Sequence, residues 1–328
     1  MNMNIKKINL NHSFIFFLFC NIFSLILFKF SNFILSPLFC LFLILIIGVS
    51  HGSLDHVKGG KLLKIFKIEN ISLFYLSYIL LVVMVVTLWI FIPSILLIIF
   101  LLVASYHFGK EDTQFLHDYN SHFMGILYFL KGSLVIWAPL YFHFDETIAI
   151  FKLLLIDNEN FYSSLSFIEN NRLIDLGIIL SSISSIILFI KKFTLRNFSI
   201  FFDYFSILIL NYYLSPLIAF TAYFCFLHSV RHSITLIYEL DNNNIKNGLL
   251  IFIKKAMPLT VLTAVICLIG IYLLNFKYEF NDSIIKVIFI GLASLTFPHI
   301  LLEYLLDKNE KQRTKNIGIC SPRILCWC

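Results

Sequence analysis

Long apolar stretches separated by short polar ones dominate the chain from residue 14 to residue 305. Several approach the ~20 residues that an α-helix needs to cross a membrane. The pattern predicts ten spanning helices, and eight or nine remain possible because the pairs that meet at Pro93 and Pro216 have almost no loop between them. The ten stretches lie near residues 14–30, 33–50, 71–91, 93–108, 122–142, 173–190, 199–214, 216–238, 257–275 and 284–305.

The composition agrees with this pattern. Hydrophobic residues make up 59% of the 328 residues and charged residues only 13%, whereas an ordinary soluble domain has roughly 25% charged residues. No internal repeat is evident, and the one long polar excursion is near residues 143–172. We expect an all-α integral membrane protein, with a single transmembrane catalytic domain over residues 1–307 and a cytoplasmic C-terminal tail over residues 308–328.

The basic residues are distributed unevenly along this predicted topology. If the spans alternate from a cytoplasmic N-terminus, eighteen of the 25 Lys and Arg residues fall on the inside and five on the outside. Such an excess is typical of cytoplasmic segments. The net charge of +6 is therefore explained by topology, and nucleic acid is not an expected partner. We predict a multi-pass protein of the cell membrane with both termini in the cytoplasm.

Two histidines stand inside the apolar stretch 216–238. His228 and His232 are four residues apart in FLHSVRH, so their rings leave the same face of a helix and can bind one ion. Ionisable side chains inside a membrane are costly and usually functional. This pair predicts an integral-membrane metalloenzyme.

Three further histidines are predicted at a similar depth, in the cytoplasmic half of the bilayer: His51, His107 and His299. Each follows or ends a stretch that runs from outside to inside. Imidazole suits iron, zinc and copper, and a ligating ring usually gives its other N–H to a carboxylate or carbonyl. Candidate carboxylates are Asp55, Asp112 and Glu303.

The remaining histidines have simpler interpretations. His12, His117, His122 and His143 lie near interfaces or in loops and are interpreted as packing or surface residues. His56 either supports a ligand, lies at the membrane interface, or is a further ligand. Arg231 either supports the site or extends to the cytoplasmic face.

The four motifs GVSHGSLDH, SYHFGKED, FCFLHSVRHS and TFPH, in this order, resemble those of the Brp/Blh family of membrane-bound β-carotene 15,15′-dioxygenases. The resemblance covers roughly residues 40–305. It departs at Ser50, where the family usually has proline before the first histidine, so a local helix bend there is in question.

This resemblance implies that His51, His107, His228 and His232 hold a non-haem Fe²⁺ and act in catalysis. His299, His56, Asp55, Asp112 and Arg231 would support the site or add a ligand. It further implies oxidative cleavage of the central 15,15′ double bond of β-carotene by O₂ to two molecules of all-trans-retinal, with a rhodopsin apoprotein as a candidate recipient. The substrate would reside in the lipid bilayer. Aromatic candidates for the substrate-binding walls are Tyr106, Phe108, Trp137, Tyr223 and Phe224, and lipid-facing bulk is an equal alternative for them.

Three other functions remain open. A histidine-box membrane desaturase or hydroxylase acting on a lipid would also show HxxxH, but it needs around eight histidines, typically with an HxxHH cluster, which this chain lacks. A transporter would place acidic residues near the midplane, where the spans carry few. A non-catalytic assembly factor for a retinal protein is the third alternative.

Overall fold

Helices make up every regular element of the described chain, which in this computed structural model comprises residues 3–29, 36–113, 116, 122–191 and 195–317. The His51 side chain lies outside the described part. The first elements are α1 (Met3–Lys29), α2 (Pro37–Leu43), the π-helix η1 (Ile44–Gly48), the 3-10 helix η2 (Val49–Leu54), α3 (Asp55–Ile65), α4 (Ser72–Phe91), α5 (Pro93–Glu111), α6 (His122–Gly132) and α7 (Leu134–Phe142). The all-α fold predicted from the sequence is confirmed.

The second part of the chain continues in the same way. Its elements are α8 (Phe144–Leu153), α9 (Glu159–Asn170), α10 (Leu173–Ile190), the 3-10 helix η3 (Leu195–Asn197), α11 (Phe198–Tyr213), α12 (Pro216–Ala222), the π-helix η4 (Tyr223–Ser229), α13 (Val230–Leu240), α14 (Ile245–Leu274) and α15 (Phe280–Ile317).

Helix forms over the described part of each of the ten predicted stretches. Among the described residues, eight helical runs are long and apolar enough to cross a membrane, and α11 is a shorter apolar helix. The eighth stretch, residues 216–238, is divided between α12, η4 and α13. The last helix continues to Ile317, past the predicted boundary at residue 307, because Lys, Glu, Gln and Arg in this polar segment are good helix formers.

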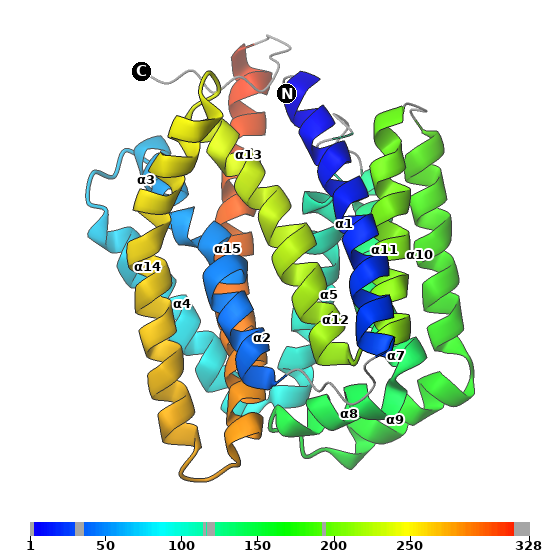
Figure 1. Cartoon of the computed structure of the whole chain (residues 1–328). Helices are drawn as coiled ribbons and strands as arrows, with labels where there is room; N and C mark the ends of the chain where they lie inside the picture. Colours follow the sequence, from blue (N-terminus) through cyan, green and yellow to red (C-terminus); the bar gives the residue numbers. More distant parts are fainter. Residues whose placement is uncertain (1–2, 30–35, 114–115, 117–121, 192–194, 318–328) are drawn as a thin grey trace.

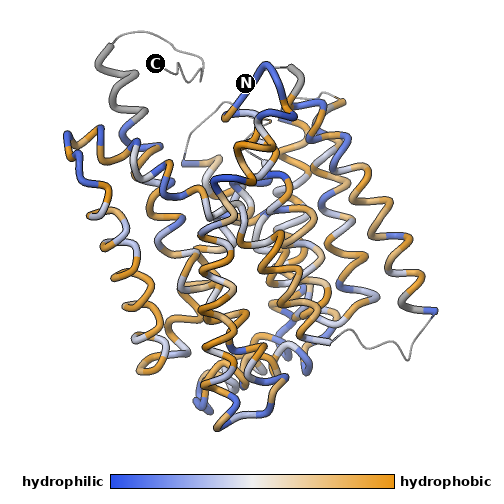
Figure 2. The backbone as a smooth tube through the Cα atoms, turned by 60° about the vertical axis from the view of Figure 1, so that its left-hand side comes forward, coloured by the Kyte–Doolittle hydropathy of each residue, from blue (hydrophilic) through white to orange (hydrophobic). Residues whose placement is uncertain are grey.

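The direction of the helices brings the histidine motifs to one level. In Figure 1, α1 begins and α15 ends at the same end of the bundle. The segments α2–α3, α5, α12–α13 and α15, which carry the four motifs, all run towards that end. Figure 2 shows predominantly hydrophobic helices in the middle of the bundle and hydrophilic residues gathered at its two ends.

The outer helices present apolar side chains to their surroundings. On α4, Leu80 is 59% exposed and Ile90 64% exposed, and on α14, Ile266 is 59% exposed. Inside the bundle, Trp89 is buried and its indole N–H donates to the carbonyl of Leu154 at 2.9 Å. An apolar outside around a packed interior is the arrangement that a lipid environment favours.

Helices α5 and α6 cross at very short range. A Cβ atom on Gly109 would lie 1.7 Å from the Tyr128 carbonyl oxygen, and one on Gly132 would lie 1.9 Å from the Ser105 carbonyl oxygen. Only glycine permits this approach, which is a common packing device in membranes. The contact fixes the part of α5 that carries His107.

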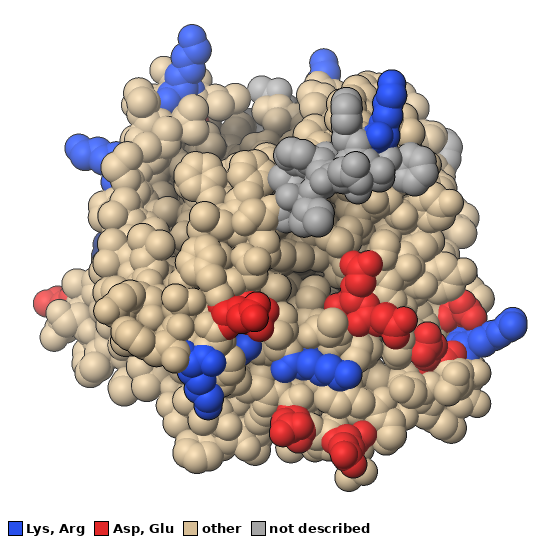
Figure 3. All heavy atoms as spheres, turned by 60° about the horizontal axis from the view of Figure 1, so that its bottom comes forward, with Lys and Arg blue, Asp and Glu red and all other residues tan. Residues whose placement is uncertain are grey.

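The polar excursion forms helices α8 and α9 at the end of the bundle opposite the start of α1 (Figure 1). Figure 3 shows this end, where acidic and basic side chains are intermixed. An open depression of about 630 Å³ lies here, lined by Lys152, Leu155, Ile156, Asp157, Asn158, Glu159 and Tyr162. None of the predicted site residues lines it.

Candidate metal centre

Four described histidines from three segments converge inside the bundle. His107 comes from α5, His228 and His232 from the η4–α13 segment, and His299 from α15. The ring centroids of His107 lie 5.2 Å from His228 and 5.4 Å from His299, and those of His232 and His299 lie 5.8 Å apart. All four side chains are buried.

Carboxylates hold three of these rings through the Nδ1 atom. An ionised carboxylate only accepts hydrogen bonds, so each ring donates from Nδ1, and a neutral ring then has its lone pair on Nε2. This is the usual support of a metal-binding histidine. The pairs are His228 with Asp112 at 3.2 Å, His232 with Glu111 at 3.2 Å, and His299 with Asp55 at 2.9 Å.

Two of these carboxylates are held in turn by tyrosines. Tyr223 donates to Asp112 at 2.7 Å, and Tyr78 donates to Asp55 at 3.0 Å. The site therefore contains two His–Asp–Tyr chains, one ending on His228 and one on His299. Such chains fix the orientation of the rings before any ion binds.

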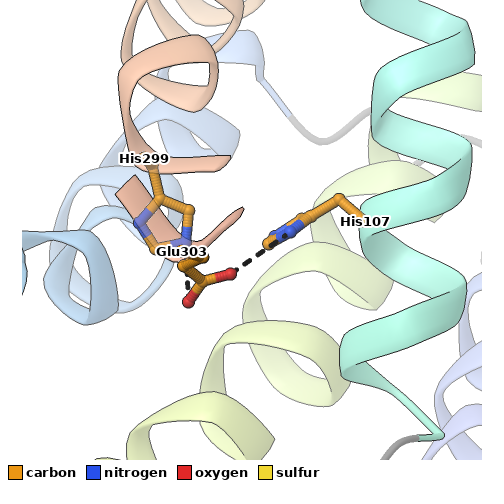
Figure 4. A group of neighbouring side chains, drawn as sticks. All are labelled: His107, His299 and Glu303. Atoms are coloured by element: carbon orange, nitrogen blue, oxygen red, sulfur yellow. Dashed lines mark ion pairs between the residues drawn. The ribbon is translucent and has the colours of Figure 1, made fainter. Parts of the chain in front are cut away.

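A fourth carboxylate, Glu303, lies between the rings (Figure 4). Lys58 donates to its Oε1 atom at 2.7 Å, and also lies 3.3 Å from Nε2 of His232. Two overlapping sets have potential ligand atoms within 4.8 Å of one another, and both contain Glu303: one with His107 and His299, the other with Glu111 and His232. The donor set of imidazoles and carboxylate fits a divalent transition metal.

The two π-helical turns pack against each other beside this cluster. The Ser229 hydroxyl in η4 donates to the Gly48 carbonyl in η1 at 3.2 Å, and a Cβ on Gly48 would meet the Phe224 ring at 2.6 Å. Single π-helical turns are frequent at functional sites. Without a proline before residue 51, the helix still changes from π to 3-10 type between Gly48 and Val49. The Ser50 hydroxyl there donates to the Ile47 carbonyl.

Arg231 is buried within the bundle rather than extended towards its surface. It donates to both oxygens of Asp203, at 2.7 and 2.9 Å, and to the Ser13 hydroxyl at 2.7 Å. It also donates to the backbone carbonyl of Asp112 at 3.1 Å. Helix α1 adds a contact between His12 Nε2 and the Phe226 carbonyl at 2.8 Å. Arg231 thus joins α1, α11 and the end of α5 to the segment that carries His228 and His232.

The aromatic residues proposed for substrate binding occupy different places. The Phe108 and Phe224 rings lie 4.8 and 5.9 Å from the His228 ring, and Tyr223 belongs to the hydrogen-bond chain above. Tyr106 is 41% exposed on the outside of α5. Trp137 packs against Gly177 of α10.

The other predicted residues are placed as follows. His51 belongs to η2, but its side chain lies outside the described residues, as does the whole of His117. His56 Nδ1 lies 2.9 Å from the Ser53 carbonyl. His122 is exposed at the start of α6, and His143 lies 3.6 Å from Glu146 at the α7–α8 junction.

Sequence reasoning missed Glu111, Tyr78 and the role of Lys58. A signal for Glu111 was present in the spacing. Each of the four motifs places a second potential ligand or carboxylate four residues after its first histidine, which puts both on one helix face. The pairs are His51 and Asp55, His107 and Glu111, His228 and His232, and His299 and Glu303. Tyr78 and Lys58 carry no such signal.

Comparisons with known proteins identify the family of the chain. A sequence profile described as beta-carotene 15,15′-dioxygenase matches residues 42–307. The chain is 28% identical over 282 residues to a beta-carotene 15,15′-dioxygenase from the uncultured marine bacterium 66A03. The aligned region covers 83% of this chain and 94% of that protein. No solved structure matches. The profile spans all four histidine motifs, and the chain therefore belongs to the family of β-carotene 15,15′-dioxygenases, which are oxidoreductases.

Proposed function

We propose that this chain binds Fe²⁺ and uses O₂ to cleave the central 15,15′ double bond of β-carotene into two molecules of all-trans-retinal. The observation that supports this best is the set of buried imidazoles, three of which are oriented through Nδ1 by Asp112, Glu111 and Asp55. Rings fixed in this way are oriented as those of metal-binding histidines are, and potential ligand atoms of His107, His299 and Glu303 lie within 4.8 Å of one another.

In this proposal His51, His107, His228 and His232 hold the iron, and His299 lies with them. The bound iron would supply the activation of dioxygen. The protein's part is to orient the rings and to keep water away. The Phe108 and Phe224 rings pack against the His228 ring, and such apolar neighbours suit a hydrocarbon substrate that resides in the bilayer.

The distribution of basic residues along the chain indicates the location and topology of the protein. We infer a cell-membrane protein with both termini in the cytoplasm, because the excess of basic residues lies on the predicted inside. The retinal produced would serve as the chromophore of a microbial rhodopsin. An apolar substrate and an apolar product can both enter and leave through the lipid.

Expression in a bacterium that accumulates β-carotene tests the proposal. We expect loss of carotenoid colour together with retinal identified by chromatography and mass. The purified protein should require added Fe²⁺ and O₂ for this turnover. Bleaching without retinal would exclude central cleavage, and turnover in an iron-free, chelator-treated preparation would exclude the iron.

A further inference from the structure

Glu303 is the carboxylate most closely surrounded by the site's cationic and metal-binding groups. It lies on α15 one turn after His299, and its side chain is only 12% exposed. Besides Lys58, it faces nitrogen atoms of His107, His232 and His299 (Figure 4 shows the first and last of these). Its position at the centre of the cluster is unlike that of the outer carboxylates.

The distances separate two kinds of contact at Glu303. Lys58 Nζ lies 2.7 Å from Oε1, a hydrogen-bonded ion pair. The histidine nitrogens are farther away, at 3.7 Å from His107 Nδ1 to Oε2, 3.7 Å from His232 Nε2 to Oε1, and 3.6 Å from His299 Nε2 to Oε1. A contact of 3.6 Å is too long for a hydrogen bond.

Such a spacing is expected between two ligands of one ion. With metal–ligand bonds of about 2.1 Å, two ligand atoms lie about 3.0 Å apart at a right angle and about 3.6 Å apart at 120°. The outer carboxylates are at hydrogen-bond distance from Nδ1 instead, at 2.9 to 3.2 Å. Glu303 therefore has the spacing of a ligand and belongs to both potential ligand sets, whereas Asp55 and Asp112 belong to neither and have the geometry of supports.

We propose that Glu303 binds the metal ion directly through a carboxylate oxygen, and that Lys58 is its fixed counter-cation. This deepens the proposed function, because it assigns a further ligand at the same site. A mixed set of imidazole and carboxylate is typical of non-haem Fe²⁺ centres with open positions. The carboxylate adds one negative charge beside the divalent ion. The ammonium of Lys58 compensates that charge in the apolar interior, where an unpaired carboxylate would be strongly destabilising.

The test measures metal binding, not turnover. Purified full-length protein and the variant Glu303→Gln are titrated with Fe²⁺ under anaerobic conditions, and with Co²⁺ as a spectroscopic probe. We expect at least a tenfold loss of Fe²⁺ affinity in the variant and a changed Co²⁺ absorption spectrum, because an amide oxygen is a weaker ligand than a carboxylate. Lys58→Met, which keeps the carboxylate, should retain a Co²⁺ spectrum of wild-type form.

The matched control is Asp307→Asn. Asp307 lies one turn farther along α15 and forms an equivalent ion pair with Lys110 at 2.7 Å, but it belongs to neither of the two potential ligand sets. The Asp307→Asn variant should therefore bind Fe²⁺ with the affinity of the wild type. Wild-type affinity and an unchanged Co²⁺ spectrum in Glu303→Gln would overturn the proposal. So would loss of affinity in Glu303→Gln that is matched in Asp307→Asn.

A second measurement uses only the wild-type protein, so it does not depend on whether a variant folds. Addition of metal to the wild-type protein should shift the stretching bands of a carboxylate in the infrared difference spectrum, and absence of any carboxylate band would also overturn the proposal. The two proposals can fail separately. A wild-type protein that binds Fe²⁺ through Glu303 but leaves β-carotene intact would refute only the proposed function, whereas retinal formation with metal binding unaffected by Glu303→Gln would refute only this inference.

Discussion

The Nδ1 atom of His299 lies 2.9 Å from each oxygen of the Asp55 carboxylate, although the two residues come from α15 and α3. Asp55 was expected to support a ligand because it stands four residues after His51. The described contact is to a histidine from another helix, so Asp55 connects two of the four motifs. Asp55 should therefore affect the site by orienting the His299 ring.

Replacement of Asp55 by Asn should lower iron affinity and carotenoid cleavage by about 10- to 100-fold, the usual cost of losing an outer partner of a ligand. Tyr78→Phe removes only the hydroxyl that donates to Asp55 and should have a smaller effect. Both are assayed at limiting iron. Wild-type turnover of Asp55→Asn under that condition would show that Asp55 is not part of the site.

Replacement of His228 or His232 by Ala should abolish retinal formation and lower the bound iron, because the site loses an imidazole and the chelate formed by the i,i+4 pair. His299→Ala should lose retinal formation and bound iron as well, since the His299 ring is held by a carboxylate in the same way. Retinal is measured by chromatography and iron by elemental analysis. The control is His122→Ala, at an exposed position at the start of α6. Full iron content in His232→Ala would remove that residue from the ligand set.

Replacement of Arg231 by Met should destabilise the protein strongly, by about 3–5 kcal/mol, because it leaves the Asp203 carboxylate buried without its partner. The double variant Arg231→Met/Asp203→Leu should recover much of this loss. Thermal unfolding in detergent gives the comparison. Lys110→Met breaks a more exposed pair with Asp307 and should cost about 1 kcal/mol or less. Equal effects of the two single variants would contradict the role given to Arg231.

Replacement of Gly109 by Ala should separate α5 from α6, because the added Cβ would lie 1.7 Å from a backbone oxygen of Tyr128, which cannot move alone. We expect loss of folded protein in a fluorescence size-exclusion assay. Gly291→Ala on α15 meets no atom within 4 Å and should behave as the wild type. A monodisperse Gly109→Ala protein with normal yield would show that the crossing can relax.

The predicted topology can be tested with reporter fusions. Fusions at both termini should report a cytoplasmic location, because α1 begins and α15 ends at one end of the bundle and the basic residues favour the inside for that end. A fusion in the α8–α9 segment, at the other end, should report the opposite side. A periplasmic signal at the C-terminus would mean that the number of spans is wrong by one.

The sequence predicted the positions of all ten helical stretches, because the length of an apolar run decides whether it can cross a membrane. It also predicted that the histidines of the four motifs lie at one depth, since depth follows from the direction of each span. His107, His228, His232 and His299 lie together, and the His51 side chain is outside the described residues. The pairings Asp55–His299 and Glu111–His232 could not be predicted, because they depend on which helix lies beside which. Residue spacing alone contains no such information.

The π-helical turns were equally beyond sequence reasoning. An apolar run such as residues 44–48 or 223–229 has the same pattern in an α-helix as in a π-helix, so only the packing of Gly48 against Phe224 and Ser229 distinguishes them. The sequence likewise predicts where the last apolar stretch ends and not where its helix ends, which is at Ile317. The end of hydrophobicity marks the end of the membrane and not the end of the helix.

The two π-helical turns make the spacing of the chain itself a constraint. A π-turn holds one more residue than the α-helical turn it replaces, so it takes up that residue while the helix beyond keeps its orientation. If the same residues of η1 or η4 formed regular α-helix instead, everything beyond that point would rotate by about 100° about the helix axis. Within η4 the rotation would point His232 away from His299. In these two stretches the form of the helix therefore matters as much as the identity of its residues, because each π-turn sets the direction in which the histidines beyond it point.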